Sequence, residues 1–594
     1  RGIYSNPTNP QILMLQNGVP MTALYSGDKG SQWGGLPLEN IARIEIIRGP
    51  GSALYGADAY SGVINIITKT AADIQGTELG VRAGSFKTRN AWAVHSGKLG
   101  DIDVAGYLAL GHSNGPNNTI ESDKQTVIDG LANTRASLAP GTLRMGYDSV
   151  DGSLELNKGA WRWRSGYKFR NNIQPGPGVL GALDPVGRGK SERITSDLSW
   201  SGMDVVPNWD VSAQASYLFY TQEYFSPFQL LPPGSIGFTN GMFGAPNTWE
   251  DQTRVSVVAT YRGLDAHTVR MGMGHDDLDL YRTQEIKNFS IQVQGQDVLL
   301  VPFADQTPVE VPEAASFMTP HRRVVDYVFV QDEWRVARDW AFTGVMRQDH
   351  YSDFGHTFNP RMALVWDARS DLTAKLLFGR AFRAPSFTEL YSINNPVVRG
   401  NSELKPESIS TWESALSWQA TADADVNLSV FRYTMKDIIR LSNQQWNNAG
   451  VQQGHGLELD VSWRVARTLK VQGNYAWQRA KDEATQADPG FAPHHHVYGR
   501  VDWRPLGAWT FGTQVNYVAD RKRPAGDARP DVPDYTTVDL NIRCGEGVKG
   551  WSFSGGVLNV FNADAREPAG ASVSIANDLP LPHRTFFIQA VYRL

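Results

Sequence analysis

Most of the chain alternates polar and apolar residues with a period of two, the pattern of β-strands that separate two environments. In the closing segment one face carries Phe586 and Ile588, while the other carries Gln589. The same split recurs at residues 254–262 and 469–478. One face suits lipid and the other a wet lumen, so the pattern predicts strands of a transmembrane barrel.

The connections between these strands differ in length. Short ones are predicted near residues 99–101, 203–208, 337–339, 368–371, 421–425, 466–468, 505–508 and 545–550. Longer Pro/Gly/Asn-rich ones are predicted near 112–149, 171–191, 222–250, 285–321, 384–404, 521–533 and 563–583. Counting strands between them predicts about 22 antiparallel strands, an even number typical of large outer-membrane barrels. No apolar run approaches the ~18 residues of a spanning helix, so a membrane location requires a closed barrel.

The first part of the chain follows another pattern. Residues 12–15, 44–47 and 63–67 are short apolar bursts separated by Gly-rich connectors. This predicts a small mixed α/β domain over residues 1–72. The barrel is then predicted over residues 73–594, with the small domain inside it as a plug.

Composition narrows the class of protein. The net charge is −5 and charged residues make up 20%, so neither a nucleic-acid partner nor a disordered acidic tail is indicated. The chain has 57 Gly, 18 Trp, 21 Tyr and 24 Phe, which suits many turns and interfacial aromatic belts. The one cysteine, Cys544, excludes an intramolecular disulfide and falls on the apolar face of its strand.

The sequence contains no recognisable catalytic constellation. The Gly-rich stretch at residues 48–69 lacks the Gly-Lys-Ser/Thr ending of a phosphate loop. Its glycines are expected to permit tight turns and close approach to a surrounding wall. There is no Gly-x-Ser-x-Gly, no His-Glu-x-x-His and no Cys-His arrangement. We therefore expect neither an enzyme nor a bound cofactor.

Several motifs resemble one known family. The run LPLENIARIEIIRGPGSALYGADAYSGVINIITK at residues 36–69, preceded by NPQILMLQNGVPM, closely resembles the plug of TonB-dependent outer-membrane receptors. The later part adds GRAFRAPSFTELY, ELKPE, GLELDVSW, LNVFN and a terminal HRTFFIQAVYRL. The resemblance implies a 22-stranded barrel in the bacterial outer membrane that encloses a plug. It also implies import driven by TonB of the inner-membrane energising complex.

The two ends of the chain depart from the family pattern. Family members usually carry several tens of residues upstream of the position of Arg1, including a TonB box, and none stands here. Because the chain also opens without Met, we expect a processed or incomplete product that lacks the N-terminal part of the plug. The last residue is Leu594, where the family usually has an aromatic side chain.

The resemblance also implies a charge cluster between plug and barrel. Two plug arginines of the family commonly pair with two barrel glutamates, and the matching residues are Arg1, Arg48, Glu413 and Glu458. Enclosed charges need partners, since removing one member of a buried pair costs about 3–5 kcal/mol. The alternative is that each charge is separately solvated in a wet lumen.

The solute is expected at the outward tips of the plug. By the resemblance these tips lie near residues 4–9 and 22–33. They offer flat apolar area, hydrogen-bonding groups and both signs of charge, which a bulky polar chelate requires. The predicted contacts are Tyr4, Asn6, Asn9, Tyr25, Asp28, Lys29, Gln32 and Trp33.

A ferric siderophore is the predicted solute, bound by a monomer embedded in outer-membrane lipid and lipopolysaccharide. Cobalamin and haem are the alternatives, and a passive porin or adhesin is the alternative from another class. Haem receptors of the family carry histidines that residues 1–72 and 386–400 here lack. His494 and His496 share one strand face and are weak metal candidates. A rim cluster without metal is the favoured interpretation.

Overall fold

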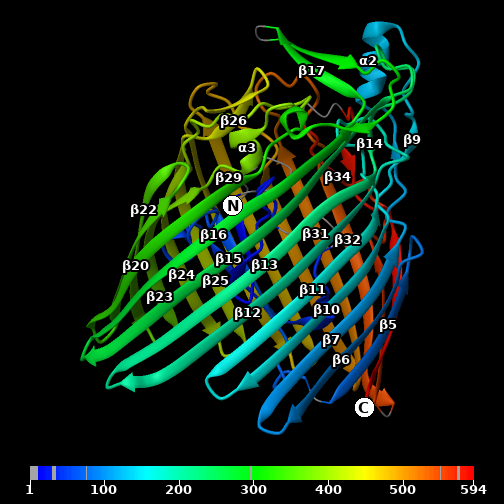
Figure 1. Ribbon diagram of the computed structural model, residues 1–594. Helices are drawn as coiled ribbons and strands as arrows, with labels where there is room; N and C mark the ends of the chain where they lie inside the picture. The colour runs from blue at the N-terminus through cyan, green and yellow to red at the C-terminus, as the bar shows by residue number, and fades with distance from the viewer. Residues whose placement is uncertain (1–10, 30–34, 75, 295–296, 549, 571–574) are drawn as a thin grey trace.

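The computed structural model in Figure 1 describes residues 11–29, 35–74, 76–294, 297–548, 550–570 and 575–594. Its main feature is a closed antiparallel barrel of 22 strands, here called the wall. The wall closes where the last strand pairs with the first, with Phe587 opposite Gly84. Closure leaves no exposed sheet edge. The predicted fold class is confirmed.

The wall strands follow one another around the barrel in chain order. They are β5 (Thr77–Gly84), β6 (Arg89–Leu99), β7 (Ile102–Ser113), β10 (Tyr147–Lys158), β11 (Trp161–Ile173), β12 (Arg188–Val206), β13 (Trp209–Ser226), β15 (Met242–Leu264), β16 (His267–Lys287), β20 (His321–Ala337), β21 (Trp340–Tyr351), β22 (Gly355–Arg369), β23 (Leu372–Arg383), β24 (Glu407–Thr421), β25 (Ala424–Lys436), β28 (Gln452–Ala466), β29 (Leu469–Asp482), β30 (Pro493–Leu506), β31 (Trp509–Arg521), β32 (Tyr535–Val548), β33 (Trp551–Leu558) and β36 (Thr585–Arg593).

The loops at one end carry further short elements. They are β8 (Thr119–Ile120), α2 (Lys124–Ala132), β9 (Gly141–Thr142), β14 (Phe228–Leu231), β17 (Phe289–Gln294), β18 (Asp297–Pro302), β19 (Val309–Glu310), η2 (Glu313–Ala315), α3 (Phe387–Tyr391), β26 (Ile439–Ser442), β27 (Gln445–Asn448), β34 (Arg566–Glu567) and β35 (Leu579–Pro580). These elements stand above the wall in Figure 1. Long loops at one end and short turns at the other are typical of outer-membrane barrels.

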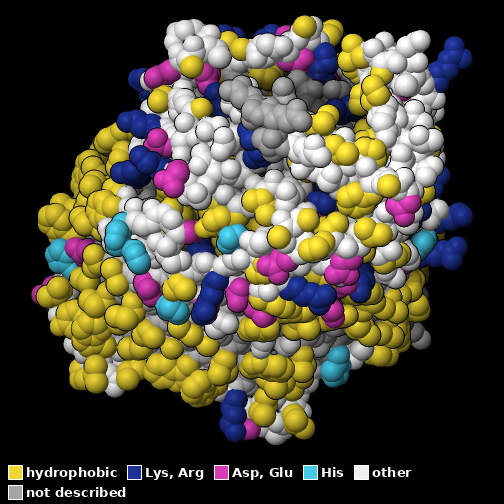
Figure 2. Space-filling model, turned by 45° about the horizontal axis from the view of Figure 1, so that its top comes forward, with side chains coloured by type: hydrophobic (Ala, Val, Ile, Leu, Met, Phe, Trp, Pro, Cys, Tyr) yellow, Lys and Arg dark blue, Asp and Glu magenta, His cyan; other side chains and the backbone are white. Residues whose placement is uncertain are grey.

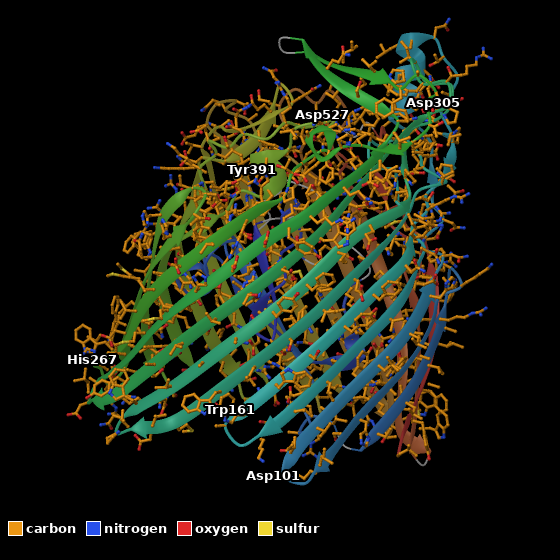
Figure 3. All side chains as sticks on the ribbon, viewed as in Figure 1. Asp101, Trp161, His267, Asp305, Tyr391 and Asp527 are labelled. Atoms are coloured by element: carbon orange, nitrogen blue, oxygen red, sulfur yellow. The ribbon has the colours of Figure 1, made fainter. Side chains whose placement is uncertain are left out.

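The two ends are distinct in the structure. Asp101, Trp161 and His267 lie at the end with short turns, whereas Asp305 and Tyr391 lie at the end with loops (Figure 3). The prediction missed two short turns, at Lys158–Trp161 and Leu264–His267, and the alternation continues in phase through the second of them. It also missed the loop connections at 437–451 and 483–492, and it missed the short one at 352–354 that joins β21 to β22.

An aromatic girdle marks the short-turn end of the outer face. Ring pairs there include Trp340 with Trp366 at 5.3 Å and Trp209 with Tyr261 at 4.8 Å between centroids. Apolar side chains form a continuous band above this end in Figure 2. Such girdles lie at membrane–water interfaces because their rings are amphipathic. In the described part of the chain, none of the helices is long and apolar enough to cross a membrane.

Inside the wall lies a small mixed domain, here called the plug, drawn in dark blue in Figure 1. Its sheet has the order β2-β1-β4-β3, with β1 parallel to β4 and the other pairs antiparallel. Its elements are β1 (Ile12–Gln16), β2 (Val19–Pro20), η1 (Leu38–Asn40), β3 (Ile41–Arg48), α1 (Ser52–Tyr55) and β4 (Gly62–Thr68). The predicted division at residues 72 and 73 falls in the connection between β4 and β5.

The plug has little core of its own. One buried cluster within it consists of Leu13, Leu15, Ala59 and Val63. A domain of this size buries too small a share of its surface to be strongly stable alone. Its other buried apolar side chains, such as Tyr60, pack against the wall. The plug is therefore held largely by contacts with the barrel around it.

Gly56 lies against the wall, where a side chain would strain the backbone and displace the end of Arg347. Gly56 has a φ of +76°, and a Cβ there would lie 2.8 Å from the guanidinium of Arg347 on β21. Any side chain would meet both backbone strain and a collision. This confirms the expectation that the Gly-rich stretch permits close approach to a wall.

Candidate functional site

Arg48, at the end of β3, joins the plug to the wall through two carboxylates on β28. Its guanidinium donates to Glu458 at 3.1 Å and to Asp460 at 2.9 Å. Glu458 was predicted at this contact, and Asp460 was not. Glu413, on β24, accepts a hydrogen bond from Ser429 at 2.6 Å. Arg1 lies outside the described residues, so the four-residue charge cluster stays a prediction.

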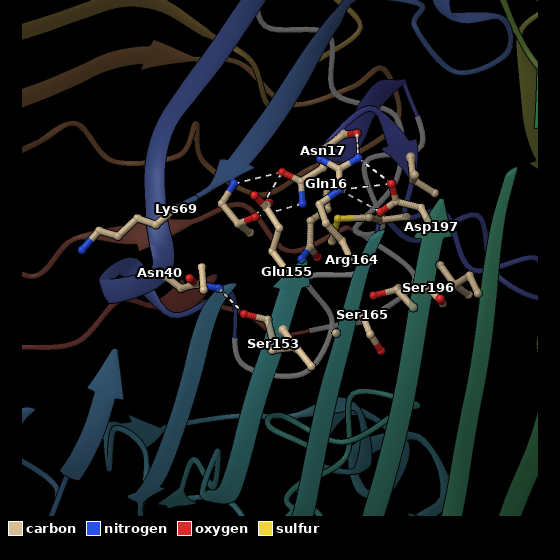
Figure 4. Close-up of a pocket in the computed structure, with 18 of the residues that line it drawn as sticks. Gln16, Asn17, Asn40, Lys69, Ser153, Glu155, Arg164, Ser165, Ser196 and Asp197 are labelled. Carbon is tan, nitrogen blue, oxygen red and sulfur yellow. Dashed lines mark hydrogen bonds and ion pairs between the residues drawn. The ribbon is translucent and has the colours of Figure 1, made fainter. Parts of the chain in front are cut away.

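A small polar cavity of about 30 Å³ lies between the plug and strands β10–β12 (Figure 4). Arg164 spans it, pairing with Asp197 and donating to the carbonyl of Asn17 at 3.4 Å. Nearby, the Asn40 amide donates to Ser153 at 2.9 Å. The space suits one or two waters with several polar partners. The contacts of the plug with this part of the wall are therefore partly polar.

Two hydroxyls and one backbone N–H of the plug bond directly to backbone groups of β23 and β24. Ser52 donates its hydroxyl to the carbonyl of Phe382 at 3.5 Å and accepts from the Phe382 N–H at 3.2 Å. The N–H of Asp58 donates to the same carbonyl at 3.0 Å. Tyr60 donates its hydroxyl to the carbonyl of Ser408 at 3.1 Å. Since all these bonds are polar, water can replace them if the plug moves.

A second set of contacts holds the plug segment 21–29. Glu250, buried on β15, accepts from the N–H of Leu24 at 2.8 Å. Its neighbour Gln252 donates to the carbonyl of Thr22 at 2.8 Å. On the loop side, Thr388 donates through its hydroxyl to the carbonyl of Tyr25 at 2.6 Å. This segment is thus fastened both to the wall and to helix α3.

A buried charge network organises the loop that carries α3. Arg383 pairs with Glu389 at 2.8 Å and with Glu407 at 2.9 Å, and all three side chains are at most 5% exposed. Ser386 and Glu389 form a capping box that begins α3. Glu407 also accepts from Gln11 of the plug at 3.4 Å. Two carboxylates and one guanidinium therefore connect plug, wall and loop.

Three of the predicted solute contacts are described, and two of them are not at the surface. Asp28 is 5% exposed and Lys29 is 3% exposed, and Lys29 forms an ion pair with Asp58 at 2.5 Å. Burial lowers the pKa of Lys29, and the charge of Asp58 opposes that shift. Here Lys29 stabilises the plug itself rather than facing the loops. A solute contact by either residue stays a prediction.

Tyr25 is only partly buried and contacts the loops. Its ring meets that of Phe317 edge to face at 5.3 Å. Burial raises the pKa of Tyr25 to about 12, so the phenol stays neutral near pH 7. The remaining predicted contacts, Tyr4, Asn6, Asn9, Gln32 and Trp33, lie outside the described residues.

A group of basic side chains faces this outward part of the plug. Arg170 on β11 donates to the carbonyl of Gly35 at 3.3 Å and pairs with Asp151 at 3.0 Å. Lys168 on the same strand and Arg193 on β12 are buried beside it, and Asp28 is the other charged neighbour. We call Lys168, Arg170 and Arg193 the lumen cations. All three are buried, at 2–8% exposed, close to the carboxylates of Asp151 and Asp28.

The sequence analysis missed the lumen cations, although a signal was present. Strand β11 reads WRWRSGYKFR, with Arg162, Arg164, Lys168 and Arg170 all on one face. Four cations on the lumen face of one strand are unusual, because enclosed like charges repel. The alternation alone placed them inward, but which plug residues they face depends on the tertiary structure.

His494 and His496 face the lumen near the loop end, as their shared strand face predicted. His494 lies between Asp520 at 2.8 Å and Asp488 at 2.7 Å. His496 bonds instead to Asn516 at 2.6 Å. In the described ranges, no group of three His, Cys, Asp or Glu residues is arranged to hold a metal ion.

The chain matches two family models. Residues 130–560 match "TonB dependent receptor-like, beta-barrel", and residues 1–63 match "TonB-dependent Receptor Plug Domain". The barrel match alone covers more than half of the chain.

The chain is also similar to individual known proteins. The iron-regulated outer membrane virulence protein of Vibrio cholerae is 23% identical over 91% of this chain and 79% of its own length. The ferrienterobactin receptor of Escherichia coli is 22% identical over 93% of this chain and 80% of its own length. A solved ferric enterobactin receptor, PfeA, superimposes with a TM-score of 0.76 at 18% identity, covering 99% of this chain and 92% of that one.

Proposed function

We propose, from the premise that this chain belongs to the TonB-dependent receptors of the bacterial outer membrane, that it imports a ferric siderophore. The family is one of receptors and transporters. Relatives of which this chain covers about four fifths are named as an iron-regulated outer membrane virulence protein and a ferrienterobactin receptor. The observation that carries the proposal is a plug enclosed in a sealed wall, with the lumen cations against its outward side.

The lumen cations suit an anionic chelate. Siderophores of the catecholate type hold Fe³⁺ with deprotonated oxygens, so the complex carries negative charge. Lys168, Arg170 and Arg193 gather basic side chains beside the carboxylates of Asp151 and Asp28. A charge-assisted hydrogen bond to such a ligand contributes about 1.5–3 kcal/mol. The aromatic ring of Tyr25 adds a flat apolar surface close by.

Import then requires that the plug change its contacts with the wall. The solute binds at the outward side, and TonB acts from the periplasmic side. A bound solute shifts the plug only by its differential affinity for the resting and displaced states. Displacement breaks polar contacts, such as those of Arg48 and Arg164, and also apolar ones, such as the packing of Tyr60 against the wall. TonB, outer-membrane lipopolysaccharide and a monomeric state are the proposed partners and assembly.

Replacing two lumen cations should weaken solute binding. We expect K168Q/R193Q to raise the Kd for the transported ferric chelate at least tenfold, because two cations near the anion are lost. The measurement is binding of ⁵⁵Fe-labelled chelates to cells that express the receptor in a siderophore-receptor deletion strain. The panel comprises a ferric catecholate, a ferric hydroxamate, cobalamin and haemin.

The matched control is K190Q. Lys190 also lies on β12 but is 40% exposed and pairs with Glu223 at 3.2 Å. It should leave the Kd unchanged. Uptake of cobalamin or haemin, with none of any ferric siderophore, would overturn the assigned substrate. Equal Kd values for K168Q/R193Q and wild type would show that Lys168 and Arg193 do not bind the solute.

A further inference from the structure

The outer face of the wall changes abruptly from apolar to basic on strands β25, β28 and β29. Cross-strand pairing aligns Val430, Leu457 and Trp477 in one row. The next row towards the loops consists of Arg432, His455 and Arg479. Lys481 stands one row further, opposite Gln453. We call Arg432, His455, Arg479 and Lys481 the basic patch.

The basic patch lies at the upper edge of the apolar band. His455 is eight residues from Trp463, an exposed aromatic residue at the short-turn end of the same strand. Eight residues span about 26 Å of strand, or roughly 20 Å of height at a tilt of about 40°. The band of such barrels is about 25 Å tall. The row of His455 therefore lies just inside the upper edge of the band, and Lys481, one row further, lies at the headgroups of the outer leaflet.

These cations are exposed and lack acidic partners. Arg432, Arg479 and Lys481 make no ion pair with any carboxylate that the structure describes. Two acids that line the groove beside these cations have other partners: Glu483 accepts from Gln453 at 2.5 Å, and Asp488 accepts from His494 at 2.7 Å.

On another side of the barrel, exposed charged residues at and above the same height pair with each other within the protein. Asp326 lies eight residues from the girdle residue Trp334 and pairs with His275 at 2.7 Å. Arg322 bonds to Asp277 at 2.6 Å. The position at the outer leaflet alone therefore does not explain the unpaired charge on β25, β28 and β29.

An open groove of about 1000 Å³ lies over the basic patch. Below it, the indole of Trp477 meets the ring of His455 edge to face at 5.6 Å. We propose that the groove binds a phosphorylated glycolipid of the outer leaflet, with its phosphates on the basic patch and its acyl chains along the apolar rows below. Arginine and lysine bind phosphate through charge-assisted bonds, and an aromatic ring suits the headgroup level. The proposal does not depend on which solute is transported.

The test is retention of bisphosphorylated lipid A by the purified full-length receptor through a detergent wash, quantified by mass spectrometry. The triple variant R432Q/R479Q/K481Q should retain at least tenfold less than wild type. R322Q removes an outer-face cation that already has a partner, and it should retain the wild-type amount. Fully dephosphorylated lipid A should be retained poorly by all variants.

Three results would overturn the proposal. One is equal retention by the triple variant and wild type. Another is equal retention of phosphorylated and dephosphorylated lipid. A third is binding of inorganic phosphate at the patch without retention of the lipid, which would show that the ligand of the patch is a free anion and not a glycolipid. Mobility of unboiled protein on gels verifies that each barrel is folded. Should the triple variant fail to fold, K481Q alone should still lower retention measurably.

Discussion

Oxidation of the double variant P50C/G379C is expected to abolish solute uptake. A Cβ built at Gly379 on β23 lies 3.1 Å from the Cβ of Pro50 in the plug, only a few tenths of an ångström inside the usual disulfide range. The bond would tie the plug to the wall covalently, so the plug could not be displaced. We expect uptake of the ferric chelate to fall at least 100-fold and to recover when the disulfide is reduced. The measurement is ⁵⁵Fe uptake in a C544S background, which removes the native thiol.

Binding distinguishes a locked receptor from a damaged one. The oxidised double variant should bind the ferric chelate with the wild-type Kd, because the lumen cations are untouched. P50C and G379C alone should transport normally under both oxidising and reducing conditions. Wild-type uptake by fully oxidised P50C/G379C would show that the solute passes without displacement of the plug.

Substitution of Arg383 by Met is expected to be strongly destabilising. It leaves Glu389 and Glu407 buried without their cation, and such a loss costs about 3–5 kcal/mol. The effect should appear as a lower midpoint of thermal unfolding in detergent. It should also appear as faster proteolysis of the loop 384–406, since α3 begins at this network.

Two further variants test whether uncompensated buried charge causes the loss of stability in R383M. R383M/E389Q/E407Q removes the uncompensated charges, so it should regain part of the lost stability. R48Q breaks a plug–wall ion pair whose arginine is 50% exposed, and exposed pairs contribute about 0–1 kcal/mol. R48Q should therefore shift the midpoint much less. A shift for R48Q as large as that for R383M would contradict this account.

Much of the fold could be predicted from local patterns. Alternation at residues 469–478 and 585–593 distinguishes the lipid-facing side of a strand from its lumen-facing side. Neighbouring residues in the sequence are enough to show it. The structure agrees: Phe586 and Ile588 are exposed on the outer face, while Gln589 bonds inward to Arg82. The turn at Leu264–His267 was missed because its residues fit the alternating pattern.

The site was harder to predict than the fold because it depends on contacts across long sequence separations. Lys29 was expected to meet solute, but its partner Asp58 comes from another part of the plug. Asp460 was missed beside Glu458 because alternation shows that both face inward but not which one reaches Arg48. The sequence shows that Lys168 and Arg170 share one face of their strand. The contact of Arg170 with Gly35 arises only when the plug is inside the wall.

The central claim is that a plug sealed within the wall must be displaced by TonB for solute to pass. The most direct test measures ⁵⁵Fe-chelate binding and uptake in the same cells, with and without functional TonB. The account predicts equal binding in both strains, with uptake only where TonB is functional. Equal uptake in the two strains would contradict it and would identify the barrel as a passive pore.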